Sequence, residues 1–199
     1  AGYGYYRMNG GLLAVGQLGA GSGVGSGNTG VFDMNSGVVN VPAAGGWILA
    51  GGWSAGSRGE FNLFGGTMIG PPGNPVSLNI FNNNNANGMI NILGANAVLI
   101  ATNNANGVNI MGGTGNSNAV INLNAGVLVA SRIYQNSAGS AQLNFNGGTL
   151  RAKEGGATVT VTMNTTGSVY VYSGGAFIDT TNSTITVSTP LRAPTGYGV

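Results

Sequence analysis

Short runs in which apolar and polar residues alternate recur along the chain, and most of them end in glycine. The pattern reads apolar, polar, apolar, any residue, small residue, Gly, and its copies occupy 6–11, 32–37, 61–66, 108–113, 121–126, 143–148 and 170–175, with a looser copy at 90–95. Alternation over four or five positions predicts a strand with one buried face, and the glycine predicts a turn. No window has the 3.6-residue period of an amphipathic helix, so the pattern predicts an all-β fold.

The spacing of the copies indicates how the strands are arranged. Their last positions are separated by 26, 29, 29, 18, 13, 22 and 27 residues, and a repeated unit of this length matches one coil of a parallel β-solenoid. Uneven spacing is compatible with this fold because insertions at the corners project outward. We therefore predict one β-solenoid domain over residues 1–199, with about eight irregular coils and short terminal tails at 1–5 and 193–199.

If the copies lie in register, equivalent positions form columns along the solenoid. The first apolar position predicts one core column, made of Tyr6, Phe32, Phe61, Ile90, Val108, Ile121, Leu143 and Tyr170. The second predicts another core column, made of Met8, Met34, Leu63, Ile92, Ile110, Leu123, Phe145 and Tyr172. Between them, on the opposite face, lies a polar column that begins with Arg7 and Asp33 and continues as a structural asparagine column: Asn62, Asn91, Asn109, Asn122 and Asn144. Identical amides one strand apart can form a hydrogen-bonded ladder.

The glycines that close the copies are predicted to lie at corners where the backbone needs a positive φ. These corner glycines are Gly11, Gly37, Gly66, Gly113, Gly126, Gly148 and Gly175. Glycine adopts positive φ without the steric cost that a side chain imposes.

Three segments resemble a known family of surface proteins. The stretch 143–152 reads Leu-Asn-Phe-Asn-Gly-Gly-Thr-Leu-Arg-Ala, and 173–180 and 185–191 follow it with Gly-Gly and β-branched segments. These segments resemble the passenger-associated β-strand repeats of bacterial autotransporter-type surface proteins, and earlier copies of the motif are similar to weaker repeats of that kind. The resemblance implies a right-handed parallel β-helix that is secreted and displayed outside the cell. It implies no catalytic residues.

Composition excludes several classes of chemistry. The chain has 39 glycines and 27 asparagines among 199 residues, only ten charged residues, and neither Cys nor His. It therefore lacks the ligands of ordinary zinc or iron sites, a thiol nucleophile and a Ser-His-Asp arrangement. We expect no catalytic, cofactor-binding or metal-binding residues. The six basic residues are scattered, which argues against nucleic-acid binding, and the long uncharged stretch 61–131 is too often broken by Gly, Pro and Asn to predict a membrane span.

Four alternatives to a purely structural role need to be weighed. The segment 25–30 matches the G-x-G-x-x-G dinucleotide motif, but the strand pattern that follows at 31–41 favours a corner loop, since the motif needs a helix there. A polysaccharide-cleaving β-helix would need paired carboxylates, for which Asp33 with Glu60 and Glu154 with Asp179 are the candidates. Trp47 and Trp53, with Tyr3, Tyr5, Tyr6 and Tyr197, could offer flat aromatic faces to sugars, although aromatic residues are more often part of the core. Alternating Thr at 158–162 and 184–188 is reminiscent of ice-binding arrays.

These observations predict a structural protein that is not an enzyme. A solenoid has two open ends with unpaired strand edges, and the sequence shows no capping helix at either one. We expect copies to assemble head to tail into an extracellular or cell-surface filament or sheath, with Tyr3, Tyr5, Tyr6 and Tyr197 at the assembly interface. The alternatives are a carbohydrate-binding adhesin or autotransporter passenger stalk, for which surface polysaccharide is the partner, and the polysaccharide-cleaving enzyme.

Overall fold

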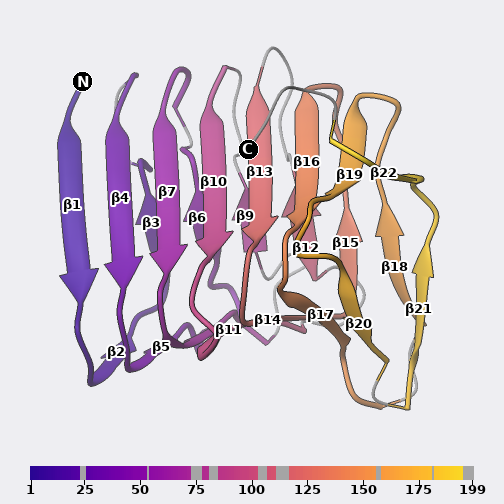
Figure 1. The fold of residues 1–199 in the computed structure, drawn as a ribbon. Helices are drawn as coiled ribbons and strands as arrows, with labels where there is room; N and C mark the ends of the chain where they lie inside the picture. The colour runs from indigo at the N-terminus through magenta and orange to yellow at the C-terminus, as the bar shows by residue number, and fades with distance from the viewer. Residues whose placement is uncertain are drawn as a thin grey trace.

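The fold consists of three parallel β-sheets that wind around one core. The computed structural model describes residues 1–22, 26–52, 54–72, 78–80, 85–102, 107–110, 117–155, 158–180 and 182–194, and the strands within them form sheets of eight, seven and seven (Figure 1). We refer to these as sheets A, B and C. Every strand pair among the described residues is parallel, and each strand pairs with the equivalent strand of the next coil.

The strands follow one another in the order A, B, C along the chain. Sheet A comprises β1 (Tyr3–Met8), β4 (Thr29–Met34), β7 (Arg58–Leu63), β10 (Asn87–Ile92), β13 (Asn118–Leu123), β16 (Ser140–Phe145), β19 (Gly167–Val171) and β22 (Leu191–Arg192). Sheet B comprises β2 (Leu12–Ala14), β5 (Val38–Asn40), β8 (Gly66–Ile69), β11 (Ala97–Ala101), β14 (Val127–Ala130), β17 (Thr149–Ala152) and β20 (Phe177–Asp179). Sheet C comprises β3 (Leu18–Ala20), β6 (Ile48–Ala50), β9 (Leu78–Ile80), β12 (Val108–Ile110), β15 (Arg132–Tyr134), β18 (Thr158–Thr162) and β21 (Thr184–Val187).

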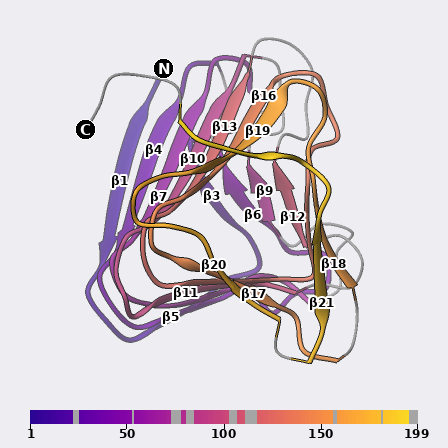
Figure 2. The same ribbon diagram turned by 45° about the vertical axis from the view of Figure 1, so that its right-hand side comes forward.

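Seen partly along its axis, the molecule is a triangular tube with one sheet on each side (Figure 2). The predicted all-β fold and its parallel β-solenoid architecture are confirmed. The expected number of eight coils is slightly too high, because the described part of the last coil contains only β22. Strand β1 begins at Tyr3, so most of the predicted tail 1–5 belongs to the first coil.

In-register stacking builds the core from columns of equivalent side chains. In sheet A the inward column runs Tyr6, Phe32, Phe61, Ile90, Ile121, Leu143, Val169 and Leu191. Its aromatic members stack on one another: the ring centroids of Tyr6 and Phe32 are 5.2 Å apart, and those of Phe32 and Phe61 are 5.5 Å apart. Aromatic pairs of this kind contribute roughly 0.5–1.5 kcal/mol beyond their buried area.

One predicted copy of the repeat lies in a different sheet. Val108, Asn109 and Ile110 form β12 of sheet C, where Val108 pairs with Leu78 and Asn109 with Asn79. The prediction that placed them in the columns of sheet A is therefore wrong. The intervals of 18 and 13 residues belong to a single coil, and Asn91 and Asn122, neighbours in the polar column, are 31 residues apart. Any alternating strand of the solenoid can reproduce the Val-Asn-Ile pattern, so the pattern alone does not identify the sheet.

The last copy of the repeat is shifted by one residue from its predicted register. Val169 pairs with Leu143 and Val171 with Phe145, so these two valines continue the core columns. Tyr170, predicted to lie in the core, instead pairs with Asn144 and continues the polar column. Tyr172, predicted as the last member of the second core column, lies beyond the end of β19. The segment is apolar on both faces, which leaves its alternation ambiguous.

Most of the predicted corner glycines have the left-handed backbone that only glycine adopts easily. Those with positive φ are Gly11, Gly37, Gly66, Gly126 and Gly175, and Gly113 lies outside the described residues. The prediction of positive φ at Gly148 is wrong: Gly147, one residue earlier, has a φ of 104°. Gly148 is constrained in another way, because a Cβ there would lie 2.6 Å from the carbonyl oxygen of Ala125.

Small residues at the first inward position of the sheet A strands allow the backbone at the end of sheet C to approach closely. The residues at this position are Gly4, Gly30, Gly59, Gly88, Ala119, Ala141 and Gly167. At Gly59 a Cβ would lie 2.0 Å from the Gly51 nitrogen and 2.2 Å from the Ala20 oxygen. The backbone that follows sheet C therefore fills the space a side chain would need.

Replacing Gly59 by alanine should destabilise the solenoid, because backbone atoms of two coils would have to move. We expect Gly59→Ala to lower the free energy of unfolding by about 2–3 kcal/mol, at the upper end of overpacking effects. Gly4→Ala is the matched control: it occupies the same column, and a Cβ there meets nothing within 4 Å. Neither glycine has a positive φ. Urea unfolding of both variants checks this, and equal losses of stability would contradict the close approach of the two sheets.

Candidate functional site: the two open ends and the amide ladder between them

The N-terminal end of the solenoid exposes apolar and aromatic side chains of the first coil. Tyr3, Tyr5, Tyr6 and Leu12 are all exposed, and Tyr6 retains 50% of its accessible surface although it belongs to an inward column. The equivalent side chains of the next two coils, Phe32 and Phe61, are buried. Tyr6 is exposed because, among the residues that the structure describes, no coil lies on the N-terminal side of the first coil.

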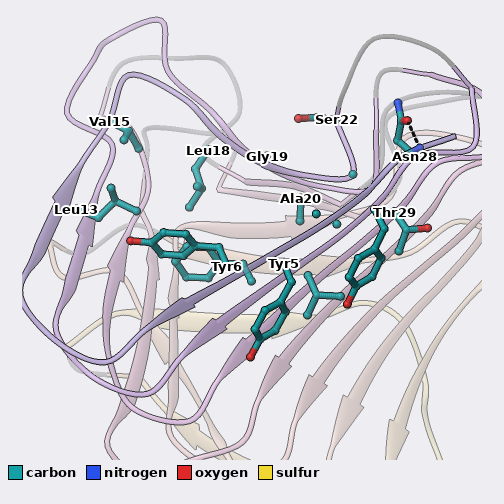
Figure 3. Close-up of a pocket in the computed structure, with 17 residues that line it drawn as sticks. Tyr5, Tyr6, Leu13, Val15, Leu18, Gly19, Ala20, Ser22, Asn28 and Thr29 are labelled. Atoms are coloured by element: carbon teal, nitrogen blue, oxygen red, sulfur yellow. Dashed lines mark hydrogen bonds between the residues drawn. The ribbon is translucent and has the colours of Figure 1, made fainter.

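This end is hollowed into an apolar cavity of about 600 Å³. Its lining includes Tyr6, Leu13, Val15, Leu18, Ala20 and Phe32. Tyr6, Leu13 and Leu18 lie around one space, whereas Tyr5 extends from the other side of β1 (Figure 3). The cavity is thus the open end of the core, lined by side chains that would contact another coil if one were present.

The C-terminal end also exposes apolar side chains. Leu191 in β22 retains 54% of its accessible surface, and Phe177 and Ile178 in β20 are exposed as well. Ile178 pairs with Leu150, a fully buried member of an inward column of sheet B. Leu191 and Ile178 are therefore core residues that lack a covering coil among the described residues.

In each sheet, one core column begins and ends in an apolar side chain that is exposed or only partly buried. The column of sheet A runs from Tyr6 to Leu191, that of sheet B from Leu13 to Ile178, and that of sheet C from Leu18 to Val187. Solenoids normally end in coils with a polar outer face, since exposed apolar ends and strand edges promote association. Both described ends depart from that rule.

At the N-terminal end, three polar side chains form a hydrogen-bonded network on the outer face of sheet A. The Tyr5 hydroxyl donates to Asp33 Oδ2 at 2.7 Å, and Arg7 Nε donates to the Tyr5 oxygen at 3.0 Å. The hydrogen bond to the Asp33 carboxylate raises the pKa of Tyr5 above 10.0, desolvation adds to this effect, and Arg7 opposes it. A carboxylate acceptor stabilises the neutral phenol, which can donate to it.

The same carboxylate begins a ladder of amides that runs along sheet A. Asn62 Nδ2 donates to Asp33 Oδ1 at 2.9 Å, and the amides of Asn91, Asn122 and Asn144 each donate to the preceding asparagine at 2.7, 2.7 and 2.8 Å. Asn91 Nδ2 also lies 3.2 Å from Glu60 Oε1. Every amide donates toward the N-terminal end, so the ladder has a direction along the axis.

Tyrosine follows the last asparagine of this ladder and of a second, shorter one. Asn144 pairs in register with Tyr170, and among the described residues Asn144 Oδ1 accepts no hydrogen bond. Asn109, the residue that does not belong to sheet A, donates to Asn79 in sheet C at 3.2 Å, and its own Oδ1 is likewise unpartnered within the described part of the chain. In sheet C it pairs with Tyr134.

Three of the four carboxylates considered for glycoside hydrolysis, Asp33, Glu60 and Asp179, take part in these hydrogen-bond networks or in an ion pair. Asp33 accepts hydrogen bonds on both oxygens, and Asp179 Oδ2 lies 2.7 Å from Arg151 Nε. Glu60 pairs in register with Val31, whereas Asp33 pairs with Asn62, so the two acids lie in different columns. Glu154 is exposed next to the end of β17. Over the described ranges, no three acidic side chains gather in a way that could hold a metal ion.

The remaining candidate features fall on ordinary elements of the solenoid. Residues 29–30 of the G-x-G-x-x-G match begin β4, so a strand follows the motif where a dinucleotide site needs a helix. The Thr array is two strands wide, since Thr160 pairs with Thr186 on one side and with Arg132 on the other. Trp47 is half-buried, while Trp53 and Tyr197 lie outside the described residues.

Within the described residues, the structure contains no helix of the length and hydrophobicity needed to cross a membrane. Comparison of the chain with protein-family models, curated proteins and solved structures finds no match.

Because each amide of the ladder donates toward the N-terminal end, replacing one amide by a carboxyl group should lower the free energy of unfolding in a pH-dependent way. Asn91→Asp replaces a hydrogen-bond donor by a carboxylate that faces Asn62 Oδ1 and Glu60. We therefore expect the free energy of unfolding at pH 7 to fall by about 2–4 kcal/mol. Repulsion and burial raise the folded-state pKa of the new carboxyl above its unfolded value of about 3.9. The loss should therefore be small below pH 4, where the protonated acid can donate, and should grow as the pH rises.

Asn118→Asp provides the control for this ladder prediction. Asn118 is exposed and makes a similar amide bond to Asn87 at 3.1 Å, so its loss should stay within about 0.5 kcal/mol. Urea unfolding of both variants at pH 3.5 and pH 7 measures the difference. A pH-independent penalty at Asn91 would contradict the donor direction.

The Tyr5 network predicts a measurable titration. In Asp33→Asn the carboxylate that raises the pKa of Tyr5 is gone, so the pKa of Tyr5 should fall toward 10. Tyr134 is an internal control, because burial raises its pKa and the opposing charge is that of Arg132. Nuclear magnetic resonance of ¹³C-labelled tyrosine between pH 8 and 12 resolves the two, and an unchanged Tyr5 titration would show that Asp33 is not its acceptor.

Proposed function

We propose that this protein is an extracellular structural protein whose copies stack head to tail into a surface filament or sheath. The observation that carries the proposal is that one core column of each sheet ends, at both ends of the solenoid, in an apolar side chain that is exposed or only partly buried. One end presents the exposed Tyr6 with the partly buried Leu13 and Leu18. The other presents the exposed Leu191 and Ile178 with the partly buried Val187. The extracellular location rests on the resemblance of the repeats to those of autotransporter-type surface proteins.

The contact between two copies in this arrangement repeats contacts that already exist between coils. Among the described strands, β1, β2 and β3 form the sheet edges at one end, and β22, β20 and β21 form them at the other. These edges belong to parallel sheets, so their backbone groups can pair with a further parallel strand. The two ends differ, which makes the contact heterologous, and a heterologous contact that does not close into a ring gives a fibre. A net charge of +2 opposes this association only weakly.

A second candidate function starts from the same exposed ends. In a carbohydrate-binding adhesin or autotransporter-type passenger stalk, further coils of one longer chain would cover them, and surface polysaccharide would be the partner. The Tyr5, Arg7 and Asp33 network on the outer face of sheet A favours this candidate, since an aromatic ring beside hydrogen-bonding groups suits a sugar. The two candidates differ in whether separate copies join.

Charges placed at either end should prevent assembly without unfolding the chain. In Tyr6→Lys and Leu191→Lys the new ammonium group can reach water in a single copy, because both positions are about half exposed. Under another coil the same group would be buried without a partner, at a cost of several kcal/mol. We expect both variants to be monomeric at concentrations where the parent protein polymerises. Phe64→Lys is the control, since Phe64 is 47% exposed on the side of the solenoid and the variant should polymerise normally.

Mixing the two end variants tests the head-to-tail direction. Each has one intact end, so an equimolar mixture of Tyr6→Lys and Leu191→Lys should form dimers and nothing larger, whereas each variant alone should not. Analytical ultracentrifugation and electron microscopy distinguish these states. A parent protein that stays monomeric at high concentration contradicts the filament, and binding of that monomer to a glycan array would support the adhesin instead.

A further inference from the structure

The outer face of sheet B is apolar along nearly the whole solenoid. Register places two outward columns on it: Leu12, Val38, Thr67, Val98, Val127, Thr149 and Phe177 in one, and Ala14, Asn40, Ile69, Ile100, Val129, Arg151 and Asp179 in the other. Most of these side chains are half-buried by their neighbours in the column, and Leu12 and Phe177 at its ends are exposed. Figure 2 shows sheet B as the lower side of the triangle, with no other labelled strand over its outer surface.

Charge distinguishes this face from the outer face of sheet A. Sheet A carries Arg7, Asp33, Arg58, Glu60 and Arg192. The first five strands of sheet B contain no charged residue, and the only charges of its strands, Arg151 and Asp179, are joined at 2.7 Å. The strands of this face therefore offer little to attract a charged partner or to repel a second copy, and the nearest further charge is that of Lys153, which lines a hollow with Asn40 and Ile69 at the edge of the face.

The size of the face indicates when such a contact can form. With about 4.8 Å between strands, seven strands and two columns cover roughly 400 Å². A stable interface buries about 800 Å² on each partner, so one copy's face is too small to hold a dimer. When copies are stacked end to end, the faces join into a continuous stripe, and the area grows with the number of copies.

We propose that the outer face of sheet B packs against the same face of copies in a neighbouring filament. This inference rests on the proposed head-to-tail assembly, and it gives that assembly a lateral contact that turns single filaments into pairs. Two flat sheets of β-branched side chains pack face to face at about 10 Å, with their side chains interdigitated and water excluded. We infer a second copy as the partner for two reasons. The strands of the face are apolar and carry no excess charge of one sign, and the area of the face reaches that of a stable interface only when several copies are stacked.

A matched pair of substitutions in one coil tests the lateral contact. Val127 lies on the outer face of sheet B, and Val120 lies on the outer face of sheet A in the preceding strand; both are half-buried. Val127→Lys should give filaments that are one solenoid wide, with the loss of paired filaments. Val120→Lys should leave the pairs intact. Filament width by electron microscopy and cross-sectional radius by X-ray scattering are the readouts, and circular dichroism verifies that both variants fold.

The outcomes separate the lateral contact from the head-to-tail proposal. If the parent protein forms only filaments one solenoid wide, or if Val120→Lys abolishes pairs as fully as Val127→Lys, the lateral contact is overturned while head-to-tail assembly stands. If the parent forms only two-copy species that Val127→Lys abolishes and the end variants leave unchanged, head-to-tail assembly fails, and so does the inference that this face joins copies only when they are stacked. A parent that remains monomeric at all concentrations overturns both.

Discussion

In-register pairing of parallel strands from coil to coil is the constraint on which the rest of the structure depends. It places each side chain about 4.8 Å from the equivalent side chain of the next coil. A residue is therefore acceptable only if its side chain can pack against whichever residue holds the same position in the neighbouring coils. Apolar and amide side chains satisfy this condition, whereas like charges in one column repel. In the strand pairs of the described residues, no charged residue has a like charge as its neighbour: Arg7 pairs with Asp33, Arg151 with Asp179, and Arg58 with Thr29 and Asn87. This explains why so few residues are charged and so many are asparagine.

The amide ladder adds a direction to an otherwise repetitive structure. Each Nδ2 donates toward the N-terminal end, so the aligned amide dipoles have their positive ends there and their negative ends toward the C-terminus. Asp33 occupies the positive end, where its negative charge is stabilised by the donors that follow it. At the other end the column continues with Tyr170 and Arg192, and a cation suits the negative end of the row. The charges thus match the dipole, and the two ends of the molecule are chemically different.

Alternation and repeat spacing were sufficient to predict the β-solenoid from the sequence, because both follow directly from strands that stack with one buried face. The register failed where the pattern was degenerate. Val108 to Ile110 alternates like the strands of sheet A but belongs to sheet C, and the segment around Tyr170 is apolar on both faces. Positive φ was assigned to Gly148 instead of Gly147, since two adjacent glycines fit the corner equally well.

Two features could not be found from the sequence by those rules. The inward column that includes Gly59 is visible only once the closeness of sheets A and C is known, because a glycine in a strand has no pattern of its own. The apolar outer face of sheet B was missed because its strands carry apolar residues on both sides. The pattern of such strands predicts that both faces of the sheet are buried, yet no other strand covers the outer face of sheet B in the described part of the solenoid.

The candidate site differs from a catalytic centre in a way that explains why no motif marks it. In a solenoid, stability is approximately a sum of terms for each coil and for each contact between neighbouring coils. A contact between two copies would contain the same terms, since Tyr6 would lie over Leu191 as Phe32 lies over Tyr6 and as Phe61 lies over Phe32. The residues that hold the fold together are then the residues that hold the assembly together. Such a contact would need no separate sequence signature, because it would be made by the apolar side chains that the described end coils expose, among them Tyr6 and Leu191.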